Sequence, residues 1–148
     1  MKAHDPQATS VLDFFEIDRA RILNACANCG KCFEVCPMTE FMTSPDFAAS
    51  AITRQVTAVL ARDAIDSSNP IQQAALEWIG SCTGSGQCID ACPNDVNPKM
   101  MLRLAKITAL GGLGDPKLLT KAEDPNWFPR VRAFARVTLT EQEQKDWM

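Results

Sequence analysis

Apolar side chains recur at helical spacing along this chain, and no stretch shows the sustained alternation that a half-buried β-strand requires. A predicted amphipathic helix over residues 47–65 carries on one face Ile52, Val56, Val59 and Leu60. The same pattern, read together with capping residues and prolines, predicts further helices over residues 10–24, 71–80, 97–110, 117–123 and 131–137. We therefore expect an all-α protein.

Several residues mark where these helices begin and end. Ser10 stands where its hydroxyl can cap the first helix. Asn97 followed by Pro98 suits the start of a later helix, because asparagine caps well and proline fits the first turn. The segments 66–70 and 111–114 are rich in turn-forming residues, so each is expected to stop the helix before it.

The helices and their breaks divide the chain into three parts. Residues 1–19 form an N-terminal leader and the start of the first helix, residues 20–112 form a helical domain with all seven cysteines, and residues 113–148 form an extension. Near the end of the extension, Thr140 and Glu143 have the spacing of a capping box and predict a last helical turn. We expect this extension to dock a partner.

The seven cysteines lie in two short runs, each of which ends in Cys-Pro. The runs are Cys26-x2-Cys29-x2-Cys32-x3-Cys36-Pro37 and Cys82-x5-Cys88-x3-Cys92-Pro93. Such spacings are typical of two-cluster iron–sulfur proteins, in which closely spaced thiolates hold one cluster and the cysteine before proline ligates the other. The pattern predicts a [4Fe–4S] cluster on Cys26, Cys29, Cys32 and Cys92, and a second cluster on Cys36, Cys82 and Cys88.

Ser85 stands in the second run at the position where another cysteine is expected, with two residues between it and Cys82 and two between it and Cys88. Without a fourth thiolate the second site can lose one iron and hold a [3Fe–4S] cluster, which is the form we favour because serine is a harder and less acidic ligand. The alternative is a second [4Fe–4S] cluster with the Ser85 oxygen or water as its fourth ligand.

Zinc binding and disulfide bonds are the alternative uses of these cysteines. A four-cysteine zinc site normally takes two separated Cys-x2-Cys pairs, and neither run follows that pattern. Disulfides are rare in the reducing cytoplasm, and an odd number of tightly spaced cysteines also argues against a disulfide scaffold. Iron–sulfur ligation is the interpretation we favour.

Charge and hydropathy restrict the partners and the location. The 148 residues carry a net charge of −3, which gives no electrostatic reason to bind nucleic acid. The only local basic cluster comprises Arg130, Arg132 and Arg136, which we interpret as a solvated helix face. No apolar run is long enough to cross a bilayer, and the first residues lack the apolar core of a secretion signal. We expect a cytoplasmic protein that contacts a membrane only through a partner.

Few other residues suit substrate chemistry. His4 is the only histidine and lies in the leader, so histidine-based acid–base catalysis has little support. The three tryptophans are expected to anchor packing or an interface: Trp78, Trp127 and Trp147. We therefore expect an electron-transfer subunit of an oxidoreductase complex and not a catalyst on its own.

The cysteine runs, followed by Val96-Asn97-Pro98-Lys99, resemble two families. One is the all-helical ferredoxin domain of succinate dehydrogenase and fumarate reductase iron–sulfur subunits, whose three-iron site is similar in its x5 spacing. The other is the small C subunit of heterodisulfide reductases, which typically keeps the extra cysteine. The resemblance covers about residues 20–110 and implies an alpha-helical ferredoxin fold that holds two iron–sulfur clusters.

The resemblance also implies a role. No plant-type [2Fe–2S] domain precedes the cysteine runs, which favours the heterodisulfide reductase likeness. That likeness implies a cytoplasmic relay between a flavin- or cluster-bearing A-like subunit and a catalytic B-like subunit. The alternative is the iron–sulfur subunit of a quinone-linked complex of the succinate dehydrogenase or fumarate reductase type. A sensor that switches on cluster loss ranks last, because the sequence contains no recognisable output domain.

Overall fold

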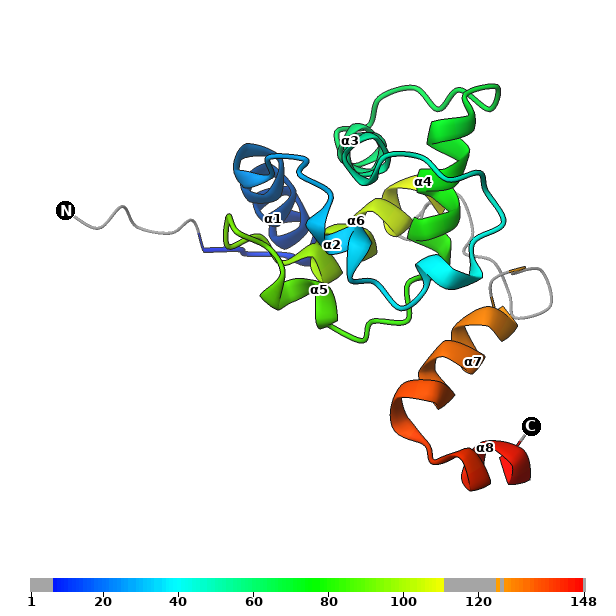
Figure 1. The fold of residues 1–148 in the computed structure, drawn as a ribbon. Coiled ribbons are helices and arrows are strands. Elements are labelled where there is room, and N and C mark those ends of the chain that lie inside the picture. Colours follow the sequence, from blue (N-terminus) through cyan, green and yellow to red (C-terminus); the bar gives the residue numbers. More distant parts are fainter. Residues whose placement is uncertain (1–6, 111–124, 126, 148) are drawn as a thin grey trace.

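The computed structural model describes residues 7–110, 125 and 127–147, and within these ranges the chain forms helices and no strand (Figure 1). In chain order they are α1 Val11–Ala25, α2 Lys31–Glu34, the 3-10 helix η1 Thr39–Phe41, α3 Ala49–Leu60, α4 Pro70–Ser81, α5 Gln87–Asp90, α6 Pro98–Leu110, α7 Trp127–Thr138 and α8 Glu141–Trp147. The expected all-α fold class is confirmed. The predicted helix over 117–123 lies outside the described residues. None of the described helices is long and apolar enough to cross a membrane.

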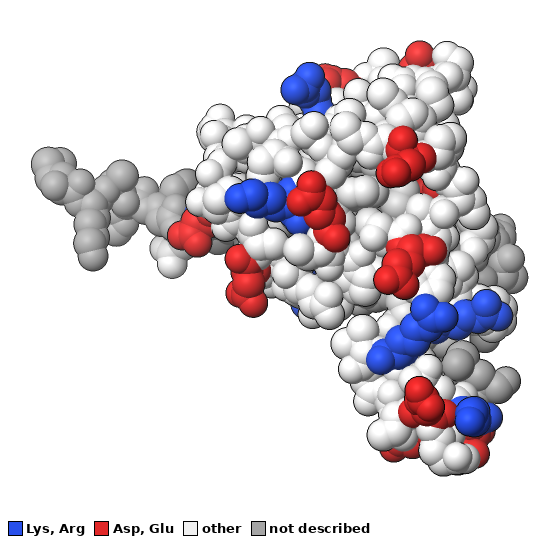
Figure 2. Space-filling model, in the orientation of Figure 1, with Lys and Arg blue, Asp and Glu red and all other residues white. Residues whose placement is uncertain are grey.

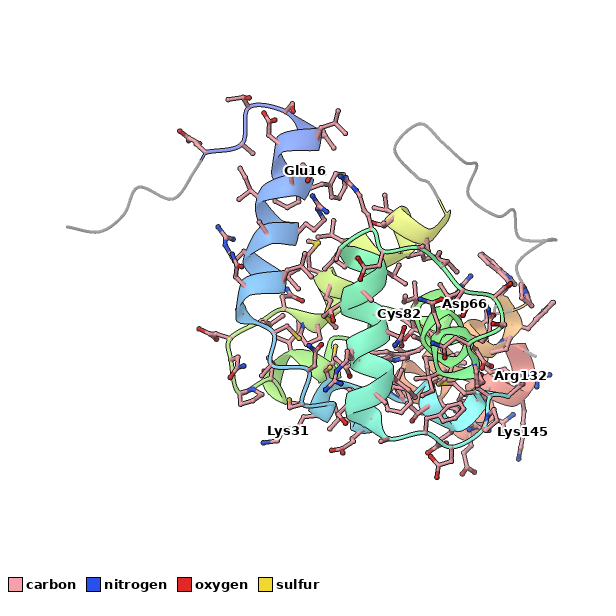
Figure 3. The ribbon with its side chains drawn as sticks, turned by 90° about the horizontal axis from the view of Figure 1, so that it is seen from above. Glu16, Lys31, Asp66, Cys82, Arg132 and Lys145 are labelled. Carbon is pink, nitrogen blue, oxygen red and sulfur yellow. The ribbon has the colours of Figure 1, made fainter. Side chains whose placement is uncertain are left out.

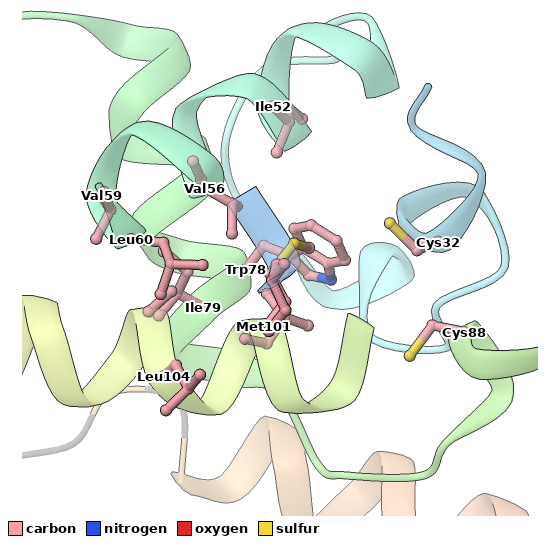
Figure 4. Close-up of a cluster of buried hydrophobic side chains, with 14 of the residues drawn as sticks. Cys32, Ile52, Val56, Val59, Leu60, Trp78, Ile79, Cys88, Met101 and Leu104 are labelled. Atoms are coloured by element: carbon pink, nitrogen blue, oxygen red, sulfur yellow. The ribbon is translucent and has the colours of Figure 1, made fainter. Parts of the chain in front are cut away.

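The core lies where α3, α4 and α6 pack on one another (Figure 4). The apolar face predicted for α3 is buried, with exposed fractions between 0% and 2% for Ile52, Val56, Val59 and Leu60. The two facing helices contribute Trp78, Ile79, Met101, Leu102 and Leu104. Because burial of each large apolar side chain is worth about 1.5–3 kcal/mol, this three-helix contact is the framework that holds the cysteine runs.

The predicted capping residues Ser10, Asn97 and Thr140 cap their helices, and Asn69, which was predicted only as part of a turn, caps a further one. Ser10 Oγ accepts a hydrogen bond from Asp13 N at 3.1 Å at the start of α1. Asn69 and Asn97 act in the same way at α4 and α6, where they accept from Ile71 N and Met100 N, both at 3.0 Å. At α8 the capping box forms, with Thr140 N donating to Glu143 Oε2 at 2.8 Å and Glu143 N donating to Thr140 Oγ1 at 3.3 Å. Each cap satisfies backbone N–H groups that have no partner inside the helix.

Helix α3 ends at Leu60, five residues before the predicted end. Arg62 adopts a left-handed conformation with φ of 68°. Its N–H donates to Val59 O at 2.9 Å, and Asp63 N donates to Ala58 O at 3.0 Å, which is the Schellman arrangement. This motif usually has glycine where Arg62 stands, so the end of the helix at Leu60 could not be predicted from the residue types.

Helix α7 packs against the cysteine-bearing core instead of standing free in solvent. The Arg130 guanidinium donates to Gly80 O at the end of α4. Arg136 lies 4.9 Å from the centre of the Phe41 ring and 3.9 Å from Glu40 Oε2. Figure 2 shows basic side chains gathered over this helix. The interpretation of the arginine cluster as a solvated face is therefore wrong for Arg130, which docks α7, whereas Arg132 and Arg136 are exposed.

Candidate iron–sulfur site

The two cysteine runs contain equivalent turns, each followed by a four-residue helix. Gly30 caps α2 and Gly86 caps α5, and both adopt the left-handed conformation with φ of 84°. This conformation is open to glycine at little cost. The residue before each glycine is Cys29 in the first run and Ser85 in the second, and both are exposed. Ser85 thus occupies the same place in its turn as a cysteine does in the other.

The first cavity is lined by three cysteines of the first run and by one cysteine of the second run. These are Cys26, Cys29, Cys32 and Cys92. The rest of the cavity wall includes Gly30, Thr53, Val96, Pro98 and Met101. None of the residues that line this cavity carries a charge. The set of four predicted ligands of the [4Fe–4S] cluster therefore surrounds one cavity.

The second cavity is lined by two cysteines of the second run and by the last cysteine of the first. These are Cys82, Cys88 and Cys36, and Ser85 lies with them. Figure 3 shows Cys82 among the helices, whereas Lys31 of the first run projects outward. The rest of the wall includes two glycines, Leu102 and the half-buried side chain of Lys99. The exchange of Cys36 and Cys92 between the two runs thus has the geometry that the spacing predicts.

The first run is held tightly against α3. A side-chain Cβ at Gly30 would come within 2.6 Å of Ala49 C and Ser50 N, so only glycine fits at this approach. Beside it, Asn28 has φ of 53° and its Oδ1 accepts from Thr57 Oγ1 at 2.9 Å. The loop is therefore fixed to α3 by both close packing and a side-chain hydrogen bond.

Burial controls the charge of the thiols. Burial, together with the neighbouring cysteines, raises the pKa of Cys32 to about 12 and of Cys88 to about 11. Burial also raises the pKa of Cys26 and Cys36. The Lys99 ammonium acts in the opposite direction on Cys88. Without a bound cation these thiols stay protonated at neutral pH, so cluster binding releases protons.

The seven cysteines suit clusters in both number and arrangement. In the part of the chain that the structure describes, no three His, Cys, Asp or Glu side chains converge on one point as ligands of a single ion would. The cysteines line the walls of two cavities instead. Thiolate is also the ligand that iron–sulfur clusters select over nitrogen and oxygen donors. The residues present therefore fit two clusters.

Three features of the site escaped the sequence analysis. Lys99 was recognised only as part of a motif, and the structure places it in the wall of the second cavity. Asn28 has no special feature in the sequence, but in the structure its side chain accepts a hydrogen bond from Thr57 of α3. Trp78 was expected as a packing anchor and is fully buried, but its indole N–H has no partner. The available signal was that Trp78 precedes Cys82 by one helical turn.

The fold and the paired cavities define a dicluster iron–sulfur protein. The chain belongs to the family of 4Fe-4S dicluster domains, whose description matches residues 22–96. As a member of this family it is an iron–sulfur electron-transfer protein.

Curated relatives are similar over the same region. The chain is 31% identical over 97 residues to the fumarate reductase iron–sulfur subunit of Mycobacterium tuberculosis (strain CDC 1551 / Oshkosh), which covers 64% of this chain and 38% of that protein. It is 28% identical over 107 residues to the subunits of the same name from Escherichia coli O6:H1 and Shigella flexneri, which covers 68% of this chain and 41% of each relative. The chain thus spans about two fifths of these relatives. No solved structure gives a significant match.

Proposed function

We propose that this chain is an electron relay that holds a [4Fe–4S] cluster in its first cavity and a [3Fe–4S] cluster in its second. The observation that carries the proposal is the exchange of Cys36 and Cys92 between the two cavities, which gives four thiols to one and three to the other. When bound, such clusters accept and release single electrons. The protein's own contribution is to hold the thiolates, shield them from water and set the local charge.

The three-iron assignment follows from Ser85. It is exposed and occupies the place of Cys29 in the equivalent turn. A serine hydroxyl is a poorer ligand for iron in such clusters than a thiolate. The second cavity therefore has one corner without a strong ligand, and Ser85 is a possible extra ligand only if a fourth iron stays bound.

The assembly we propose is of the fumarate reductase type, with this chain between a flavoprotein partner and a quinone-linked partner. The support is the name shared by the relatives described above, which cover the cysteine runs. The second candidate is a heterodisulfide reductase-like complex with A-like and B-like subunits, and it rests on the cysteine motif alone. Affinity purification from the native host discriminates between them, because the first predicts a flavoprotein with a membrane subunit and the second a cysteine-rich B-like subunit.

Reconstitution tests the cluster assignment. Anaerobically reconstituted protein should contain about seven irons, with a paramagnetic signal from the three-iron site after oxidation. The variant S85C restores a fourth thiol and should raise the content to about eight irons with loss of that signal. Stoichiometric zinc without iron or sulfide would contradict the proposal, and eight irons in the unmodified protein would exclude the three-iron form.

A further inference from the structure

Trp78 presents a polar group that the protein itself leaves unsatisfied. Its side chain is 0% exposed, and its Nε1–H is the one buried side-chain nitrogen or oxygen in the described ranges that has no hydrogen-bond partner. Buried polar groups are nearly always paired, because an unpaired one loses its bonds to water without compensation. A group that fits in this cavity would be expected to supply the missing acceptor.

The orientation of the indole is fixed by its neighbours. Trp78 lies on α4 four residues before Cys82, so both lie on the same side of the helix. The ring of Phe33, from the short helix of the first run, packs edge-on against it, with centroids 5.0 Å apart and planes at 83°. Figure 4 shows the indole nitrogen on the side of the ring that faces Cys32 and Cys88. The N–H is therefore held toward the cysteines.

The cysteine side chain with which the Trp78 indole interacts as a donor is that of Cys36. The N–H does not complete a hydrogen bond to this sulfur with the thiol alone. Cys36 lines the second cavity, so the indole acts on the second site and not on the first.

We infer that Trp78 donates its indole N–H to the Cys36 sulfur when the second cluster is bound and thereby raises the reduction potential of that cluster. This inference rests on the proposed function. One-electron reduction adds negative charge that is shared with the sulfurs, so an N–H donor stabilises the reduced cluster more than the oxidised one. Trp78 is thus a positioning residue that acts through Cys36.

A redox titration tests the inference. In holoprotein titrated anaerobically with dithionite and followed by electron paramagnetic resonance, W78F should reduce the equilibrium constant for reduction of the second cluster about tenfold, which is about 59 mV for one electron. The first cluster should keep its potential. W127F is the matched control, because it replaces a tryptophan that lines neither cavity, and should leave both potentials unchanged. An unchanged second potential in iron-loaded W78F overturns the inference and leaves the proposed function intact.

Two further measurements guard against misfolding of W78F. In a W127F/W147F background Trp78 is the only tryptophan, and replacing it with β-(3-benzothienyl)alanine exchanges the N–H for sulfur in a ring of nearly the same shape. This protein should show the same fall in potential. With ¹⁵N-indole tryptophan in that background, the paramagnetic second cluster should show a hyperfine coupling to the indole nitrogen that disappears in the benzothienyl protein. Absence of the coupling in the labelled protein would overturn the inference.

Discussion

The two cysteine cavities are built on the same turn but differ in what surrounds them. The first has four cysteines, an uncharged wall and a glycine pressed against the backbone of α3. The second has three cysteines, an exposed serine, and Lys99 in its wall. One local motif thus gives two cavities with different surroundings, and charge and hydrogen bonds near the sulfurs are among the factors that set the potential of a bound cluster.

The largest effect is expected from removing the last cysteine of either run, because each is proposed to ligate the cluster of the other run. C92A removes a cysteine of the second run but should leave the first cavity with three thiols, so that the first cluster loses at least one iron. C36A removes a cysteine of the first run but should destroy the second cluster. Iron and sulfide analysis together with electron paramagnetic resonance distinguishes the two clusters. If each variant lost the cluster of its own run, the exchange of ligands would be disproved.

Gly30 and Gly86 have the same backbone conformation but different surroundings, so substituting each separates the cost of backbone strain from the cost of a steric clash. G30A and G86A impose the same left-handed φ of 84° on alanine, at about 1 kcal/mol each. A Cβ at Gly30 would also meet backbone atoms at 2.6 Å, whereas the nearest atom at Gly86 is Ile89 Cδ1 at 3.7 Å. We expect G30A to lower the free energy of unfolding by about 3 kcal/mol or more and G86A by about 1 kcal/mol, measured by urea denaturation. Equal losses would show that α3 does not constrain the first turn.

Glu77 on α4 accepts hydrogen bonds from Thr43 and Ser44 and so connects the segment after the first cysteine run to the helix that precedes the second run. Partial burial pushes its pKa up, but hydrogen bonds from Ser44 and Thr43 outweigh this and lower the pKa below its ordinary value of 4.5. A lowered pKa means that the carboxylate stabilises the fold above pH 4.5 and that this stability is lost as the pH falls through the folded-state pKa. E77Q should therefore cost about 1 kcal/mol at pH 7.

The pH dependence checks the cause of that loss. The difference in urea stability between E77Q and the unmodified protein should narrow below pH 4.5, where the carboxylate of the unmodified protein takes up a proton. E40Q is the control, because Glu40 is exposed and its nearest cation, Arg136, lies at 3.9 Å. A difference in stability that stays constant at every pH would mean that the charge of Glu77 does not contribute to its hydrogen bonds with Thr43 and Ser44.

The smallest effect is expected from the cation in the second cavity. K99Q should lower the equilibrium constant for reduction of the second cluster about threefold, since a half-buried charge is screened by solvent, and leave the first cluster unchanged. K31Q is the control, because Lys31 is exposed and projects outward (Figure 3). If K99Q shifted the reduction potential of the first cluster more than that of the second, Lys99 would not act mainly on the second cavity.

The sequence predicted the long helices and their caps because apolar periodicity and capping are local. The face of α3 and the asparagine cap of α6 are examples. It missed α2 and α5, since a four-residue helix has too few positions to show a period and depends on a left-handed glycine. It also placed the start of α7 after Pro129, although the helix begins at Trp127 and accepts proline in its first turn.

The cysteine spacing predicted which thiols share a cavity, because the pattern itself requires each run to lend its last cysteine. It could not predict the wall around them. Lys99 of α6 and Trp78 of α4 come close to the cysteines only through the packing of these helices. The tuning of the two sites therefore depends on tertiary contacts that no spacing rule contains.

The proposed exchange of ligands also has a consequence for the order in which the clusters can form during synthesis. Cys92 lies 60 residues after Cys32 in the chain, so the first cavity lacks its fourth thiol until nearly the whole cysteine-bearing region has been synthesised. If the exchange holds, we expect neither half of the domain to hold a complete cluster when it is transplanted alone.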